Sequence, residues 1–132
     1  MLVEDGKKAI ARLVANQFKL MQLGDGGDDT SPKQTELDSA VTSKNSNMTV
    51  QVTNKQIIFS CTFTGADINS TNINELGIFS DNSYSGTDSS KVNNKLLARI
   101  NFNNLGPFAA NDTVNLTLVM EVAWYAYKHR IY

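Results

Sequence analysis

Few residues in this chain combine the types and the spacing that chemistry at a catalytic site requires. The carboxylates Glu75, Asp112 and Glu121 have no convergent partners in the sequence, and spacing alone does not indicate a glycosidase pair. The single cysteine, Cys61, and the single histidine, His129, lack the partners for a catalytic triad, a zinc site or a disulfide. We therefore expect a protein that is not an enzyme, with no catalytic residue, no metal site and no cofactor.

The run Gly24–Asp29 is rich in residues that can bind calcium or phosphate. Its spacing does not match the calcium loop of an EF-hand, and it lacks the Lys and Ser/Thr of a phosphate-binding loop. Its glycines permit positive φ angles, and its Asp side chains can bond to their own backbone. A turn is therefore favoured over a ligand site.

Composition predicts one soluble domain spanning residues 1–132. Of these 132 residues, 41% are hydrophobic and 19% are charged, which is ordinary for a globular protein. The net charge of −1 gives no electrostatic case for a nucleic-acid partner. No stretch approaches the ~18 apolar residues needed to cross a bilayer, so we expect no membrane partner.

Hydrophobic periodicity predicts a helix over residues 6–17, with Ile10, Leu13, Val14 and Phe18 on one face. From Phe18 the period changes to two. Alternating apolar residues then predict strands over 18–24, 48–53, 57–64, 73–79, 96–102 and 114–124. The Asn54-Lys55 pair joins the second and third of these strands in a hairpin, and Cys61 is expected to be a buried, inert thiol between Phe59 and Phe63 on the same face.

The fold class predicted from these elements is mainly β: an antiparallel β-sandwich or jelly-roll-like domain with an N-terminal helix. The helix precedes a β-rich body over residues 18–124, and residues 125–132 form a C-terminal tail. Residues 33–41 are either one or two helical turns or a strap that crosses the sheet. The polar stretch 80–94 is expected to be an exposed loop that presents Tyr84.

Short motifs occur in a recognisable order along the chain. They are Gly24-Asp25-Gly26, Thr30-Ser31-Pro32, Thr35-Glu36-Leu37, Asn74-Glu75-Leu76-Gly77-Ile78-Phe79 and Leu96-Leu97-Ala98-Arg99. This order, over roughly Lys8 to Val122, resembles a loose group of small virion proteins of tailed bacteriophages. Similar patterns occur in N-terminal domains of tail-collar fibres and in small proteins encoded near phage head genes. This chain departs from the pattern in the last strand, where Val119-Met120 replaces an aromatic residue that is often found midway. The tail matches nothing in the pattern.

The resemblance implies a non-enzymatic structural protein that decorates and cements a phage capsid by bridging neighbouring subunits. The implied partners are the major capsid protein and copies of the chain itself, as a homodimer or homotrimer. The implied location is the capsid surface of a virion assembled in the host cytoplasm. Tyr and Arg are enriched at protein interfaces, and the termini carry them beside basic and apolar residues. The candidate interface residues are Leu2, Val3, Lys7, Lys8, Tyr125, Tyr127, Lys128, Arg130 and Tyr132.

Two other functions remain open at this stage. One is a tail, baseplate or fibre-attachment component of the same kind of virion. The other is a carbohydrate-binding β-sandwich module, for which Tyr84 in the loop is the candidate contact. Glu75 and Arg99 are a candidate structural pair on neighbouring strands, worth less than ~1 kcal/mol if exposed to solvent. Their alternative role is to contact a neighbouring subunit.

Overall fold

Each segment of alternating apolar residues forms a strand. A computed structural model describes residues 1–69, 71–81 and 92–123. Within these residues the strands are β1 (Phe18–Gly24), β2 (Met48–Thr53), β3 (Gln56–Thr64), β4 (Ile73–Ser80), β5 (Leu96–Leu105) and β6 (Thr113–Glu121), and the helices are α1 (Glu4–Gln17) and α2 (Gly65–Ile68).

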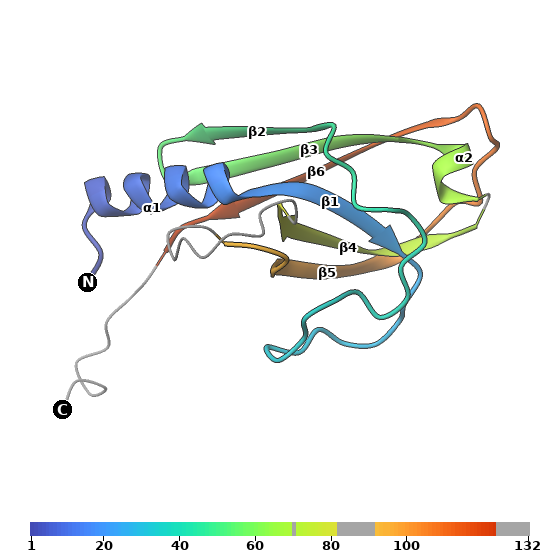
Figure 1. Cartoon of the computed structure of the whole chain (residues 1–132), viewed down its shortest axis with the longest axis horizontal. Helices are drawn as coiled ribbons and strands as arrows, with labels where there is room; N and C mark the ends of the chain where they lie inside the picture. The colour runs from blue at the N-terminus through green and yellow to red at the C-terminus, as the bar shows by residue number, and fades with distance from the viewer. Residues whose placement is uncertain (70, 82–91, 124–132) are drawn as a thin grey trace.

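The strands form two antiparallel sheets of three strands each, in the orders β1-β4-β5 and β2-β3-β6. We call them the first sheet and the second sheet. They stack as two layers, with α1 beside the second sheet and running without a loop into β1 (Figure 1). The predicted fold class, a mainly β antiparallel sandwich with an N-terminal helix, is confirmed.

The main core lies between the two sheets. On β3 the inward residues Ile57, Phe59, Cys61 and Phe63 are at most 3% exposed, as their alternation predicts. They pack in one cluster with inward residues of the first sheet, which include Met21, Leu23, Leu76 and Ile78. The hairpin turn falls where it was expected, because Asn54 adopts a positive φ of 56° between β2 and β3.

The helix α1 begins at Glu4, two residues before the predicted start, and its buried face differs from the prediction. Ala11 is fully buried and Val14 packs against the core, whereas Leu13 is 66% exposed. Assigning Leu13 to the buried face was wrong. Successive residues are about 100° apart around a helix, so a buried face centred on Ala11 and Val14 turns Leu13 toward solvent.

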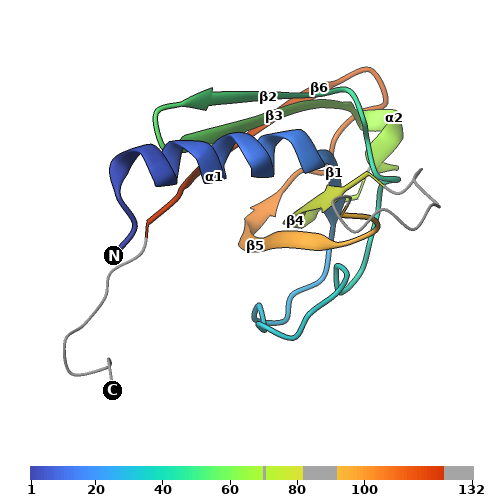
Figure 2. The ribbon, with the colours of Figure 1, turned by 60° about the vertical axis from the view of Figure 1, so that its left-hand side comes forward.

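Residues 25–47, which we call the strap, leave β1 and cross the outer face of the first sheet before entering β2 (Figures 1 and 2). Two alternatives were predicted for residues 33–41, and the structure shows the crossing strap and not the helical turns. Its later part runs along β1, where the amides of Val41 and Asn45 donate to the carbonyls of Leu23 and Met21 at 2.9 and 2.8 Å. These bonds cover an edge of β1 that would otherwise expose unpaired backbone groups.

Other differences concern element bounds. β5 extends to Leu105, three residues past the predicted end of that strand. The connector after β3 contains the short helix α2, which has a capping box formed by Thr64 and Asp67. The last strand ends at Glu121, three residues before the predicted end. Tyr84, most of the loop 80–94 and all of the tail 125–132 lie outside the described residues. No helix in the described ranges is both long and apolar enough to cross a membrane.

The buried position of Cys61 predicts low reactivity of its thiol. The side chain is 3% exposed, and burial raises the pKa of the thiol. We expect a thiol-specific reagent to label the native protein at least about 100-fold more slowly than the unfolded protein, because labelling requires local opening of ~3 kcal/mol or more. The control is Gln51→Cys in a Cys61→Ser background, which places the thiol at an exposed position of β2. Equal labelling rates for the two native proteins would contradict the expectation.

Candidate functional site

Glu75 and Arg99 form an ion pair on the outer face of the first sheet, under the strap. Arg99 Nε donates to Glu75 Oε1 at 2.8 Å, and both side chains have no exposed surface. Arg99 stands opposite Gly77 on β4 and Glu75 stands opposite Asn101 on β5, so the two ions meet diagonally across neighbouring strands. The pair that the sequence indicates is therefore present, but it is buried and not the exposed pair for which the small energy was given.

The carboxylate of Glu75 accepts hydrogen bonds from three backbone amides of the strap. The amide of Gly26 donates to Oε2 at 2.6 Å, that of Ser39 donates to Oε2 at 2.9 Å, and that of Asp38 donates to Oε1 at 3.0 Å. With Arg99, the carboxylate accepts from four donors. A buried charge is tolerated when it is paired and hydrogen-bonded in this way.

The guanidinium of Arg99 makes the matching contacts on its own side. One terminal nitrogen donates to Asp38 Oδ2 at 3.0 Å, and the other donates to the carbonyl of Asp28 at 2.9 Å and to Thr30 Oγ1 at 3.3 Å. We call the set Asp28, Thr30, Asp38, Glu75 and Arg99 the clamp. The clamp joins the first part of the strap, through Asp28 and Thr30, and its later part, through Asp38, to β4 and β5.

The glycines of the Gly24–Asp29 run make room for the clamp. A side chain at Gly24 would overlap with Glu75 Oε2 and the carbonyl of Ser39, and a side chain at Gly26 would overlap with Glu75 Oε2 and Asp38 Cβ. The close approach of the strap to the carboxylate therefore requires glycine at both positions. Gly77 makes room for apolar packing instead, because Leu37 and Phe79 pack where its side chain would be.

The electrostatics of the clamp keep Glu75 ionised. Burial acts to raise the pKa of Glu75, but the bond from Arg99 and the three strap amides outweigh it, so that the pKa lies below its usual value. A general acid or base needs a pKa near neutral pH and access to substrate. Glu75 has neither, so its chemistry is that of a structural ion.

The described residues contain no group of three or more His, Cys, Asp or Glu side chains that could hold a metal ion. In the Gly24–Asp29 run, the Gly26 amide and the Asp28 carbonyl are used by the clamp. Sequence reasoning found Glu75 and Arg99 but missed Asp38, Thr30 and Gly26 as their partners. For Thr30 and Gly26 the available signal was their position in the short motifs. Asp38 lies outside these motifs, and nothing local indicates that the three segments meet.

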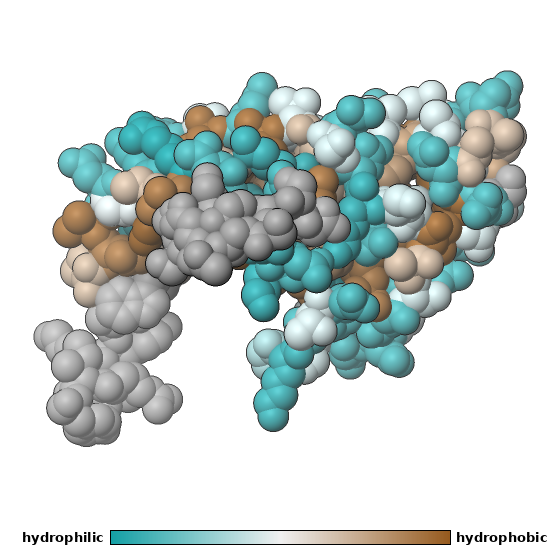
Figure 3. All heavy atoms as spheres, viewed as in Figure 1, coloured by the Kyte–Doolittle hydropathy of each residue, from teal (hydrophilic) through white to brown (hydrophobic). Residues whose placement is uncertain are grey.

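Among the N-terminal interface candidates, Val3 is 66% exposed, while Leu2 and Lys8 are half-buried. The Lys7 side chain is only 13% exposed and pairs with Glu4 at 3.5 Å, so little of it is available to a partner. Apolar residues gather on the surface near the start of α1 (Figure 3). The C-terminal candidates, Tyr125, Tyr127, Lys128, Arg130 and Tyr132, lie outside the described residues.

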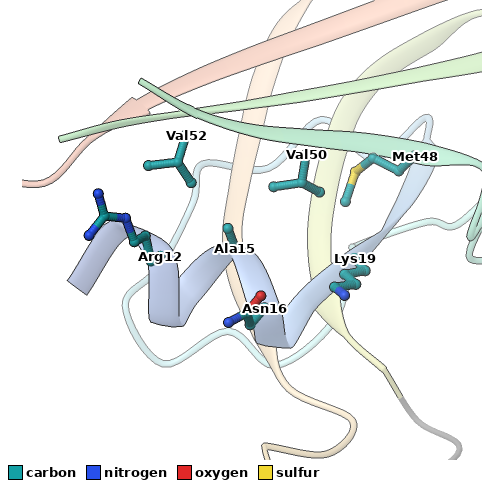
Figure 4. Close-up of a pocket in the computed structure, with 7 residues that line it drawn as sticks. All are labelled: Arg12, Ala15, Asn16, Lys19, Met48, Val50 and Val52. Carbon is teal, nitrogen blue, oxygen red and sulfur yellow. The ribbon is translucent and has the colours of Figure 1, made fainter. Parts of the chain in front are cut away.

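A hollow of about 450 Å³ separates α1 from the edge strand β2. Met48, Val50 and Val52 point from β2 toward the helix, and Arg12 and Lys19 stand at its two ends (Figure 4). The hollow therefore combines apolar side chains of β2 with a basic side chain at each end. The sequence analysis did not single out this hollow, because helix and strand are far apart in the chain.

No family model and no curated protein matches this chain.

Removing one member of the buried pair leaves an uncompensated buried charge. We expect Arg99→Met to lower the free energy of unfolding by about 3–5 kcal/mol, and Glu75→Met/Arg99→Met to cost less than the sum of its two single changes. Chemical denaturation measures both. The control is Lys55→Met, which removes partly exposed ion pairs with Glu4 and Glu121 and should cost about 1 kcal/mol or less. Equal losses for Arg99→Met and Lys55→Met would contradict a clamp.

The lowered pKa of Glu75 predicts a pH dependence of stability. The stabilisation is complete above the unfolded-state pKa, about 4.3, and is lost as the pH falls through the lower pKa of the folded state. Glu75→Gln has no charge to lose at this position. The gap in unfolding free energy between wild type and Glu75→Gln should therefore be larger at about pH 6 than at about pH 3. A gap of the same size at both pH values would refute this assignment.

Proposed function

We propose that this chain is a non-enzymatic structural protein of a tailed-phage virion, which decorates the capsid and stabilises it by bridging neighbouring capsid subunits. The proposed partners are the major capsid protein and further copies of the chain, on the capsid surface.

The observation that carries the proposal is the convergence of the motifs on which the resemblance to phage virion proteins rests. Gly26, Thr30, Glu75 and Arg99 come from four of these motifs, and all four meet in or against the clamp. Leu37, from a fifth motif, packs beside Gly77. Motifs that share one structural task are less easily produced by chance than unrelated short matches. Their convergence supports the resemblance and, through it, the virion assignment.

The way in which the strap is hydrogen-bonded to the first sheet suits a cementing role. The clamp holds the long strap on the sheet, so the domain presents a fixed surface to its partners. Binding at a repeated lattice gains avidity, because each contact raises the effective concentration of the next. A small rigid domain with several weak contacts can therefore stabilise a shell.

The start of α1 is the contact surface that we favour. Val3 occupies the N-cap position without a side-chain hydrogen bond to the helix, and most of its side chain faces solvent. An exposed valine is a poor choice both for helix capping and for solubility. Residues that violate a local rule in this way are expected at functional sites.

This assignment predicts opposite effects of Val3→Ser on folding and on binding. Serine caps the helix, so the free energy of unfolding should rise by about 1 kcal/mol. Binding to capsids should weaken, because an apolar contact is lost at every copy. Val119→Thr, at a 53% exposed position on the outer face of the second sheet, is the matched control and should bind normally. Normal capsid binding by Val3→Ser would remove this surface from the proposal.

The decisive experiment mixes purified protein with phage heads that were assembled without it, separates the bound fraction by sedimentation, and images the particles by cryo-electron microscopy. Density that repeats over the icosahedral shell is the expected result. Failure to bind the shell would overturn the capsid role. Density confined to the tail or the portal vertex would favour the alternative tail or fibre-attachment role.

A further inference from the structure

The two sides of the sandwich differ in how they are closed. On the side of β1, the strap pairs with the strand edge. On the opposite side, β5 and β6 are the edge strands of their sheets, and an apolar groove of about 380 Å³ opens between them. Six apolar side chains line this groove: Leu76, Ile100, Phe102, Leu105, Leu116 and Leu118.

Much of the groove surface remains in contact with water. Leu105 is 42% exposed, and Phe102, Leu116 and Leu118 are only partly buried. The outer edge of β6 has no strand partner among the described residues. Exposed apolar surface beside free strand edges is a site where an extended segment adds as a further strand. The strand would hydrogen-bond to the edge and insert alternate side chains into the groove.

Residues 124–132, which we call the tail segment, have the composition of such a strand. Their sequence is Trp-Tyr-Ala-Tyr-Lys-His-Arg-Ile-Tyr, rich in the aromatic and β-branched residues that strands prefer. With a period of two, Tyr125, Tyr127 and Ile131 share one face of a strand. A cavity of this size falls in the range that holds a drug-sized ligand, so aromatic side chains fit in it.

The connection after β6 favours a second copy as the partner. The Val122 amide still donates to the Lys55 carbonyl at 2.9 Å, so the chain continues past the end of β6. Residues 122–124 contain no Gly, Asn, Asp or Pro, which a tight hairpin back along β6 needs. Nine extended residues span about 30 Å, enough to reach a neighbouring molecule.

We propose that the groove between β5 and β6 receives the tail segment of a second copy of this chain as an added strand. The inference deepens the proposed function, since it states how copies would join, and it rests on that function only for its biological purpose. Its test uses the purified chain alone. Failure of the test would leave capsid binding unaffected, and failure to bind capsids would leave self-association unaffected.

The test compares full-length variants by sedimentation velocity over a range of concentrations. Leu105→Glu places a charge in the groove at an exposed position that tolerates it, and Tyr125→Ser/Tyr127→Ser removes the aromatic face of the tail segment. Each variant alone should weaken self-association by about 30-fold or more, as expected for loss of a main interface contact. The control, Val119→Glu, adds the same charge at an exposed position outside the groove and should associate like the wild type.

Mixing the two defective variants gives the sharpest outcome. The groove variant keeps an intact tail segment and the tail variant keeps an intact groove, so the mixture should form a heterodimer at concentrations where either variant alone is mainly monomeric. A wild-type chain that stays monomeric at every soluble concentration would overturn the proposal. It would also be overturned by tail variants that associate normally, which would indicate another occupant of the groove, or by a mixture that does not associate.

Discussion

The structure depends on one buried ion pair, between Glu75 of β4 and Arg99 of β5. Two charges without exposed surface are tolerated when they are paired and hydrogen-bonded, and here the further hydrogen-bonding partners of the pair come from the strap. The pair therefore holds a long irregular segment in a single path across the first sheet. Ordering the strap costs conformational entropy, and the hydrogen bonds of the pair offset this cost.

The path of the strap in turn makes the sandwich asymmetric. Once it crosses the outer face of the first sheet, its later residues pair with β1, and Leu37 and Lys44 cover Phe79 on that face. The opposite side, between β5 and β6, receives no such cover within the described residues. Within the described residues, one side is thus closed by the strap, and the other leaves an apolar groove beside an edge of β6 that has no strand partner.

This division of labour gives the short motifs of the sequence a physical meaning. The glycines admit the carboxylate, Glu75 and Arg99 supply the charges, and Thr30 and Leu37 anchor the strap. The motif residues stabilise the contact between the strap and the first sheet, and these contacts identify no ligand. The other notable surface features lie away from the clamp: the exposed valine at the start of α1, the hollow beside β2 and the groove between β5 and β6.

The sequence by itself determined the strands, the inward face of β3 and the hairpin at Asn54, because alternation of apolar residues and turn chemistry act over a few neighbouring residues. It also indicated the Glu75–Arg99 pair. The spacing of Thr64 and Asp67 is that of a capping box and is typical of a helix start, here that of α2. Only the tertiary structure decided that the pair is buried, that Asp38 completes it, and that Leu13 faces solvent. Burial is set by contacts between segments far apart in the chain, and no local period encodes such contacts.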